Sequence, residues 1–162
     1  MASFSPEYLS ADIDQVRARL RQASDKEAIL EMVRTNGREI CKSDGITFVF
    51  KKDGQCFYAE EDAIGPLWKG QTFPCDHCIS GWAMRTGEVV VVEDVFSDPR
   101  ILPEIYAPTF VRSLIMAPVG GRNFAAMGAY WKDQRHFTAI EIATVKIFST
   151  VVGAALEELL NH

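Results

Sequence analysis

Residues 73–87 read Phe73-Pro-Cys-Asp-His-Cys-Ile-Ser-Gly-Trp-Ala-Met-Arg-Thr-Gly87, and Val89-Val-Val-Val92 follows almost at once. The first run predicts a short helix over residues 79–86, because most of these residues are good helix formers and Gly87 tolerates the positive φ at which helices end. The valine run has no polar alternation, which is typical of a strand buried on both faces. A short helix that leads directly into a buried strand indicates a fold built from layers of helix and sheet.

Apolar segments on either side extend this pattern. Ser113-Leu-Ile-Met-Ala-Pro-Val119 and Phe124-Ala-Ala-Met-Gly-Ala-Tyr-Trp131 flank Gly120-Gly-Arg-Asn123 and predict a hairpin. Lys52-Asp-Gly54 lies between two other apolar runs, and an Asp-Gly pair in that setting predicts a second hairpin. Thr138-Ala-Ile-Glu141 matches a capping box and predicts a terminal helix through about residue 160.

Two helices are predicted before the first hairpin. Ser10 is placed to cap a helix over about residues 11–23, with a narrow apolar stripe. Ser24-Asp-Lys-Glu27 matches a capping box for a second helix, whose buried stripe would contain Ile29, Met32, Val33 and Ile40. Helices are therefore expected both before the first strand and after the last strand of the sheet.

The order of these segments resembles a GAF domain of the kind attached to bacterial sensor histidine kinases. The resemblance covers roughly residues 24–160 and is carried by the segments 73–100, 111–119 and 127–131. It implies an α+β fold, an α/β sandwich in which the N- and C-terminal helices pack on one face of a central antiparallel sheet and a loop-helix ligand layer lies on the other. We therefore expect residues 24–162 to form the GAF domain and residues 1–23 an N-terminal helix available for dimerisation.

The resemblance also implies a role. It predicts a non-enzymatic sensory domain that binds a small ligand and takes part in signal transduction, within two-component signalling and with a histidine kinase as partner. A homodimer is expected as well, since Leu20 and the outer face of residues 140–160 offer more apolar surface than one sheet needs to cover.

Composition narrows the partners and the location. The 162 residues, 48% of them hydrophobic, suffice for one sizeable core and leave no room for a second catalytic domain. A net charge of −5 and scattered Lys and Arg residues argue against nucleic acid. No charged leader and no uninterrupted apolar run of membrane-spanning length is present, so we expect no membrane association and a cytoplasmic location.

Aromatic residues and one helix start predict the ligand site. Aromatic walls with few polar anchors suit a small organic guest, and the amides of residues 79–81 at a helix N-terminus suit a small anion, to which Arg112 would add charge. Trp68, Trp82, Tyr106 and Trp131 are the expected walls. The full set of expected ligand-binding residues is Trp68, Phe73, Cys78, Ile79, Ser80, Gly81, Trp82, Tyr106, Phe110, Arg112 and Trp131.

The cysteines open an alternative, a Cys-dependent redox protein that uses Cys75 and Cys78. A helix N-terminus favours a thiolate, so this pair could act as a redox sensor or as part of an enzyme that resembles free methionine sulfoxide reductase. Those enzymes need a further cysteine in the loop before the strand at Ser113, and the chain has no cysteine after Cys78. Cys41 and Cys56 are isolated in sequence and are expected to be small buried hydrophobes.

Other cofactor chemistry is not expected. A closed zinc site would need a second Cys or His pair at matching spacing, and a thioredoxin-like fold would need a βαβ unit before the cysteine pair. The Cys-His pair that anchors a bilin in related photoreceptors is missing from residues 101–111, and His77 and His136 are expected to be solvated loop residues rather than haem ligands.

Overall fold

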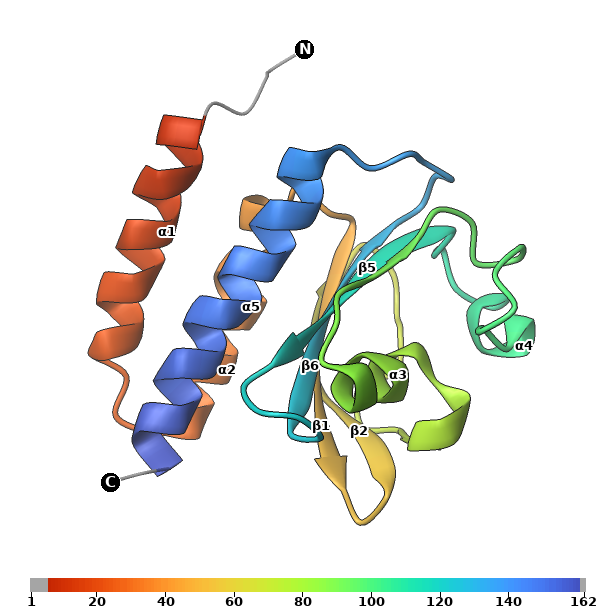
Figure 1. Ribbon diagram of the computed structural model, residues 1–162, viewed down its shortest axis with the longest axis horizontal. Helices are drawn as coiled ribbons and strands as arrows, with labels where there is room; N and C mark the ends of the chain where they lie inside the picture. Colours follow the sequence, from red (N-terminus) through yellow and green to blue (C-terminus); the bar gives the residue numbers. More distant parts are fainter. Residues whose placement is uncertain (1–5, 161–162) are drawn as a thin grey trace.

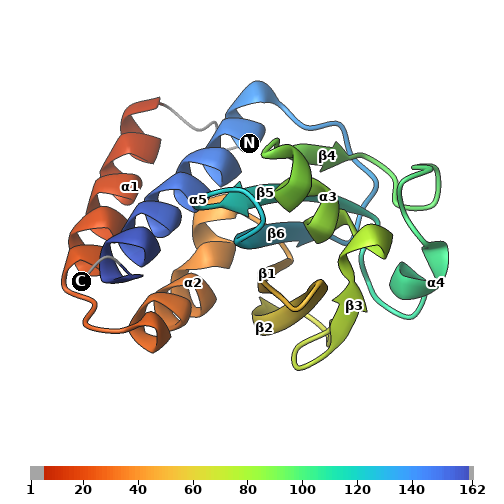
Figure 2. The same cartoon turned by 60° about the horizontal axis from the view of Figure 1, so that its bottom comes forward.

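The computed structural model describes residues 6–160, arranged in layers of helix and sheet (Figures 1 and 2). Two long helices cover one face of a six-stranded sheet, a third helix packs on the outer side of these two, and a shorter helix with the adjoining loops covers the other face. In chain order the elements are α1 (Pro6–Arg21), α2 (Lys26–Cys41), β1 (Gly45–Lys52), β2 (Gln55–Ala63), β3 (Thr72–Pro74), the 3₁₀ turn η1 (Cys75–His77), α3 (Ile79–Thr86), β4 (Val90–Val92), α4 (Pro103–Tyr106), β5 (Ser113–Val119), β6 (Ala125–Trp131) and α5 (Ala139–Leu160).

The sheet has the strand order β3-β2-β1-β6-β5-β4, and all its neighbours are antiparallel. The β1–β2 turn uses Asp53 and Gly54, both with positive φ (53° and 76°), as a tight hairpin of this kind requires. The predicted α+β sandwich is confirmed. The valine strand, β4, lies at one edge of the sheet, where Val90 and Val92 are buried and Val91 is half-buried.

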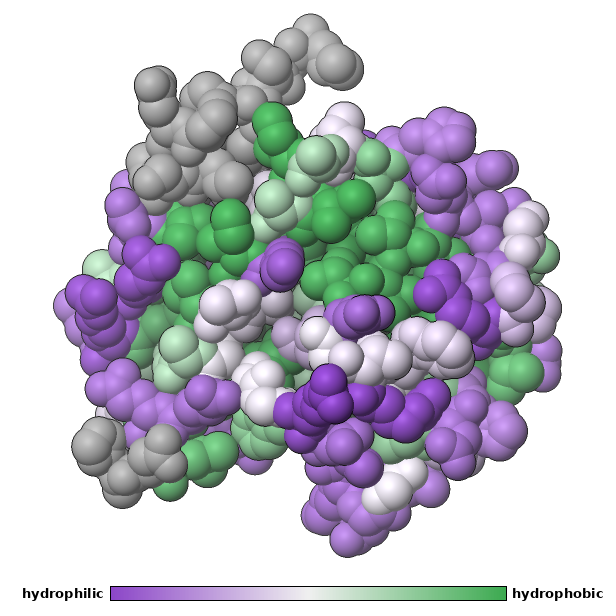
Figure 3. Space-filling model, in the orientation of Figure 1, coloured by the Kyte–Doolittle hydropathy of each residue, from purple (hydrophilic) through white to green (hydrophobic). Residues whose placement is uncertain are grey.

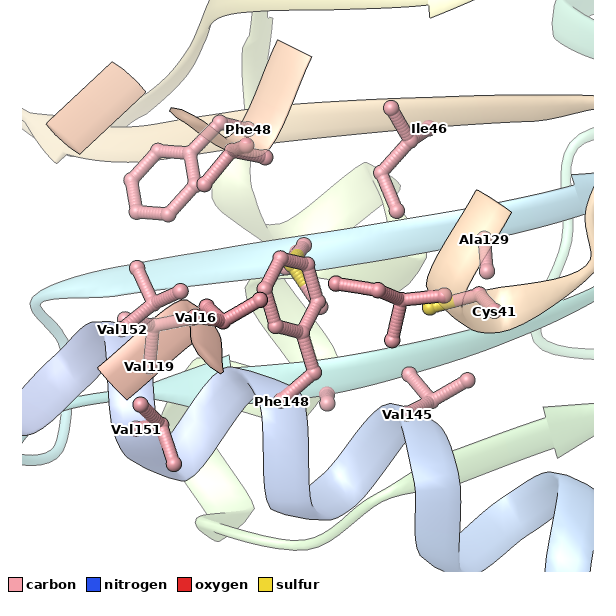
Figure 4. Packing of buried hydrophobic residues seen from close by; sticks show 14 of the residues in the cluster. Val16, Cys41, Ile46, Phe48, Val119, Ala129, Val145, Phe148, Val151 and Val152 are labelled. Carbon is pink, nitrogen blue, oxygen red and sulfur yellow. The ribbon is translucent and has the colours of Figure 1, made fainter. Parts of the chain in front are cut away.

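Two apolar cores lie on opposite faces of the sheet. The larger one lies between the sheet and helices α2 and α5 and is extended by α1 on their outer side; it includes Phe48, Ile46 and Phe148, which are drawn in Figure 4. The second lies between the sheet and the α3 layer and includes Met84, Leu114 and Tyr130. Successive residues of each central strand belong in turn to one core and then to the other, because successive side chains in a strand point to opposite faces of the sheet.

The predicted N-terminal cap is confirmed at one helix and is wrong at two others. At α5, the Thr138 hydroxyl accepts from the Glu141 amide (3.1 Å) while the Glu141 carboxylate accepts from the Thr138 amide (2.9 Å), so this capping box is confirmed. At α2 the N-cap is Asp25 rather than Ser24, and its carboxylate accepts from Ala28 N at 2.9 Å. Because α1 begins at Pro6, Ser10 lies within it and is not its cap; proline at a first helical position fits its fixed φ.

Of the described helices, only α5 combines the length and the apolar composition of a membrane span, with a mean hydropathy of 1.7. Val145, Phe148 and Val152 from this helix are fully buried against the sheet. Its hydropathy therefore reflects, at least in part, its position in the larger core.

Candidate functional site

Three cysteines from separate segments meet between the sheet and α3. Cys56 lies on β2, Cys75 on η1 and Cys78 immediately before α3. The Sγ atoms of Cys56 and Cys75 are 3.2 Å apart. The contact arises because β3 pairs with β2 with Phe73 opposite Cys56, and the Cys75 amide then donates to Gly54 O (3.2 Å).

Helix α3 rests directly on the backbone of Cys75. A Cβ atom built on Gly81 would lie 2.0 Å from the Cys75 carbonyl oxygen, so only glycine allows the helix to come this close. Arg85, in the last turn of α3, donates from Nη1 to the same oxygen at 2.9 Å. The cysteine turn and the helix are therefore held as one unit.

Cys78 is the half-buried member of the group and is placed to ionise. A hydrogen bond from the Cys56 thiol, then those from the Ser80 hydroxyl and the Gly81 amide and the positive charge of Arg85, lower the pKa of Cys78 to about 6 against the opposing effect of burial. The pKa of Cys56 is correspondingly raised, by its hydrogen bond to Cys78 and by burial, so Cys56 stays a thiol. A nucleophilic thiolate thus lies beside a protonated thiol.

A short chain of buried hydroxyls continues from Cys78 toward the sheet. The Cys78 sulfur is 3.2 Å from Ser80 Oγ, which is 3.3 Å from the hydroxyl of Tyr58. Burial raises the pKa of Tyr58, so this phenol remains protonated. Ser80 is fully buried, which fixes it between the two groups.

The predicted pocket interior is filled by rings. The ring of Trp68 makes edge contacts with Tyr58, Tyr106 and Tyr130 at centroid distances of 5.5, 5.2 and 5.5 Å, and Trp68 Nε1 donates to Ile105 O. Phe73 packs edge-on against Tyr58 at 5.6 Å. Trp68 and Tyr106 therefore lie together as expected, but as members of a packed aromatic cluster.

Two expected walls lie elsewhere. Trp131 belongs to the larger core on the opposite face of the sheet, where its Nε1 donates to Lys42 O at 2.8 Å; its neighbour Tyr130 takes the position on the α3 side. The prediction was wrong by one residue along β6, and a shift of one residue moves a side chain to the opposite face of the sheet. Trp82 is 39% exposed on the surface of α3, with the guanidinium groups of Arg85 and Arg100 each 5.9 Å from its ring.

Two of the expected anion anchors, the Gly81 amide and Arg112, are already engaged. The Gly81 amide donates to the Cys78 sulfur, so the anion at this helix start is the thiolate itself. Arg112 donates to Thr109 O and Val111 O and lies over the ring of Phe96, which ties it to its own loop. Of the remaining expected residues, Ile79 is buried and Phe110 packs at the margin of the smaller core.

Three hollows in the described surface lie away from these cysteines. A hollow of about 440 Å³ lies between α1 and α5, one of about 590 Å³ between α5 and the β4–β5 edge, and one of about 190 Å³ between α1 and α2. Although three thiols meet at the site, no group of three His, Cys, Asp or Glu side chains within residues 6–160 is arranged to hold a metal ion.

Cys56 is the member of the cysteine group that sequence reasoning missed. It was expected to be an isolated buried hydrophobe, but it contacts both other cysteines. The available signal was period-2 alternation in the Cys56-Phe-Tyr58 segment, which places Cys56 and Tyr58 on one face of the strand. What the sequence did not show is that residues 72–74 would pair with that strand.

The fold and the site first define the class of protein, an α+β domain that holds three thiols between its sheet and a short helix. The family follows from comparison, since the model described as "GAF domain" matches residues 23–157. The chain belongs to the GAF domain family, which confirms the GAF part of the resemblance seen in the sequence. No curated protein matches the chain.

Solved structures with this fold serve different roles. The free methionine-R-sulfoxide reductase from Neisseria meningitidis is 17% identical, with a TM-score of 0.80 over 99% of this chain and 95% of that one. The GAF domain from Acinetobacter phosphoenolpyruvate-protein phosphotransferase is 10% identical, with a TM-score of 0.80 over 98% of each chain. The phycocyanobilin-bound GAF domain from a cyanobacterial phytochrome is 16% identical, with a TM-score of 0.75 over 99% of each chain. At these identities the similarity shows the fold.

Proposed function

We propose that this chain is a sensory GAF domain whose input is a small oxidant that reacts with Cys78. The observation that carries the proposal is the meeting of three thiols under α3, with Cys56 and Cys75 3.2 Å apart and the half-buried Cys78 beside them. The stimulus is thus a small molecule, as expected for a GAF domain, but it is recognised by its reaction with sulfur.

Two features of the site support a reaction at Cys78 rather than reversible binding of a larger guest. The aromatic cluster of Tyr58, Trp68, Tyr106 and Tyr130 fills the space in which a planar ligand was expected. The thiolate is the form of cysteine that attacks oxidants, and Cys78 is held in that form by Cys56 and Arg85. A cytoplasmic setting, where thiols are kept reduced, completes the proposal.

Peroxide should oxidise Cys78 first. At neutral pH, brief exposure to hydrogen peroxide with dimedone present is expected to label Cys78, and Cys78→Ser should abolish the labelling because the remaining thiols are buried. Cys41→Ala is the matched control, since Cys41 lies in the opposite core and burial raises its pKa to about 12. Mass spectrometry of the labelled peptides checks this; labelling that persists in Cys78→Ser would contradict the proposal.

A second function, reduction of free methionine sulfoxide at the same site, is favoured by one observation. The Neisseria reductase shares the fold at a TM-score of 0.80. Release of methionine from free methionine-R-sulfoxide, with dithiothreitol as reductant, decides between the two: turnover that depends on Cys78 would make the protein a reductase, whereas its absence, with Cys78 still oxidised by peroxide, leaves the sensory function.

For output, we propose that two copies associate through α5 and α1 and pass the signal to a histidine kinase in a two-component system. Apolar residues gather on the face that α5 crosses (Figure 3). Ile140, Ile147 and Ala154 recur every seven residues and are exposed, so they form one stripe along α5. The adjoining hollow has Arg17 and Glu158 among its lining residues, and these charges can pair across a two-fold axis. Leu20, by contrast, is 4% exposed and belongs to the core rather than to this surface.

Ile147→Glu should convert a dimer to a monomer with little loss of stability. Ile147 is 37% exposed, so a carboxylate is tolerated in a monomer but would be buried without a partner in the dimer. Light scattering over a range of concentrations measures the mass. Ile64→Glu, at an exposed loop position away from α5, is the control and should leave the mass unchanged. A monomeric wild type at every concentration would refute the dimer.

A further inference from the structure

We infer that the three cysteines form a thiol relay, in which Cys78 is oxidised first and the disulfide that results comes to rest between Cys56 and Cys75. This inference rests on the proposed function, since it requires Cys78 to react with an oxidant. It adds a role for Cys56, a final disulfide and the recovery of Cys78 as a free thiolate.

The order of burial separates the roles of the three sulfurs. Cys78 is half-buried, Cys75 is 8% exposed and Cys56 is fully buried. An oxidant from solvent therefore meets Cys78 first. Cys56 contacts both other cysteines, through its hydrogen bond to Cys78 and its 3.2 Å approach to Cys75 Sγ. The Cys78 sulfur approaches Cys75 at its carbonyl oxygen (3.9 Å), whereas Cys56 meets both other cysteines through its sulfur, so Cys56 is placed to pass the oxidation on.

The first step consumes one molecule of a hydroperoxide. The Cys78 thiolate attacks the terminal peroxide oxygen, the O–O bond breaks, and its electron pair leaves on the second oxygen, which takes a proton from solvent. Cys78 becomes a sulfenic acid and the hydroperoxide is reduced to an alcohol, or to water from hydrogen peroxide.

The second step forms a disulfide inside the protein. The Cys56 sulfur attacks the sulfur of the Cys78 sulfenic acid, the S–O bond breaks, and the departing hydroxide takes the Cys56 proton and leaves as water. One Cys56–Cys78 bond has then formed, and both oxidising equivalents of the peroxide are accounted for.

The third step moves that bond without further oxidation. The Cys75 sulfur, after losing its proton to solvent, attacks the Cys56 sulfur, and the electron pair of the Cys56–Cys78 bond leaves on Cys78. Thiols of lower pKa leave faster in such exchange, and the pKa of Cys78 is lowered whereas that of Cys56 is raised. The exchange is therefore directed toward a Cys56–Cys75 bond and a free Cys78.

The Cys56–Cys75 disulfide would move the backbone of Cys75, on which α3 packs. The 3.2 Å between the two sulfurs must shorten to an S–S bond of about 2.05 Å, which draws η1 toward β2. Gly81 packs on the Cys75 carbonyl oxygen and Arg85 donates to it, so a shift of Cys75 is passed to the helix. Oxidation thereby changes the position of an element that contacts β5 and β6.

Disulfide mapping after peroxide treatment tests the relay. Asp76 stands between Cys75 and Cys78, so cleavage before aspartate separates the two cysteines into different peptides. In the oxidised wild type we expect a Cys56–Cys75 crosslink, with the loss of two hydrogens and Cys78 still open to alkylation. In Cys75→Ser the oxidation should stop at a Cys56–Cys78 crosslink. In Cys56→Ala, a replacement suited to its buried position, dimedone should trap Cys78 as the sulfenic acid.

The outcomes separate the relay from the proposed function. A wild-type crosslink between Cys75 and Cys78, or one that remains at Cys56–Cys78, overturns the relay while Cys78 stays the first thiol oxidised. Absence of the dimedone adduct in folded Cys56→Ala, together with undiminished oxidation of Cys78→Ser, overturns the proposed function itself. Circular dichroism of each variant verifies that the fold is intact, and Cys41→Ala should give the wild-type crosslink.

Discussion

Replacing Gly81 with alanine should lower the free energy of unfolding by more than about 3 kcal/mol. At an ordinary interior position of a helix the same change would raise stability by up to about 1 kcal/mol, because alanine is the better helix former. Here the new methyl carbon would lie 2.0 Å from the carbonyl oxygen and 2.7 Å from the carbonyl carbon of Cys75. Backbone atoms cannot rotate away as a side chain can, so α3 would have to leave its position.

Gly121→Ala is the matched control. Gly121 lies in the β5–β6 hairpin, and a Cβ atom there would meet nothing within 4 Å. Urea unfolding of both variants should show a large loss of stability for Gly81→Ala and a change of less than about 0.5 kcal/mol for Gly121→Ala. Equal stability of Gly81→Ala and the wild type would mean that α3 does not rest on Cys75.

Local signals in the sequence were sufficient for most of the fold. The Asp53-Gly54 turn, the Gly87 helix end and the capping box of Thr138 and Glu141 each act over a few residues, and each has the expected role in the structure. The family resemblance supplied the order of the layers. Helix starts were placed less well, because several polar residues near the start of α1 and of α2 are acceptable caps.

The site was harder to predict because it depends on contacts between distant segments. Alternation gives two faces to β6 but does not say which face meets α3, so Trp131 was assigned in place of Tyr130. Trp68 was correctly placed near Tyr106, yet the loop before it is held by an interaction that local sequence does not indicate. The Glu61 carboxylate accepts from three successive amides of residues 67–69 at 2.8 to 3.0 Å.

Ionisation of Cys78 underlies both its proposed reaction with oxidants and the thiol relay. A cysteine in water has a pKa of about 8.5 and is mostly protonated at neutral pH. The hydrogen bonds from Cys56, Ser80 and the Gly81 amide favour the charged form, and these and Arg85 lower the pKa of Cys78 to about 6. Because the pKa of Cys78 is lowered, the thiolate is present above about pH 6 and is lost as the pH falls through this value.

Alkylation of Cys78 as a function of pH therefore has a defined expected profile. Iodoacetamide reacts with the thiolate, so the rate of Cys78 labelling should follow the ionised fraction. Arg85→Gln, which removes the positive charge but keeps an amide, should shift the midpoint upward. Cys41→Ala, in the opposite core, should leave it unchanged.

The most direct measurement is this pH profile in the wild type, read by mass spectrometry of the peptide that contains Cys78. We expect a midpoint near the pKa of about 6 to which Cys56, Ser80, Gly81 and Arg85 lower Cys78, and loss of the fast-labelled site in Cys78→Ser. A Cys78 labelling rate that rises only above about pH 8, as for an ordinary cysteine, would contradict it.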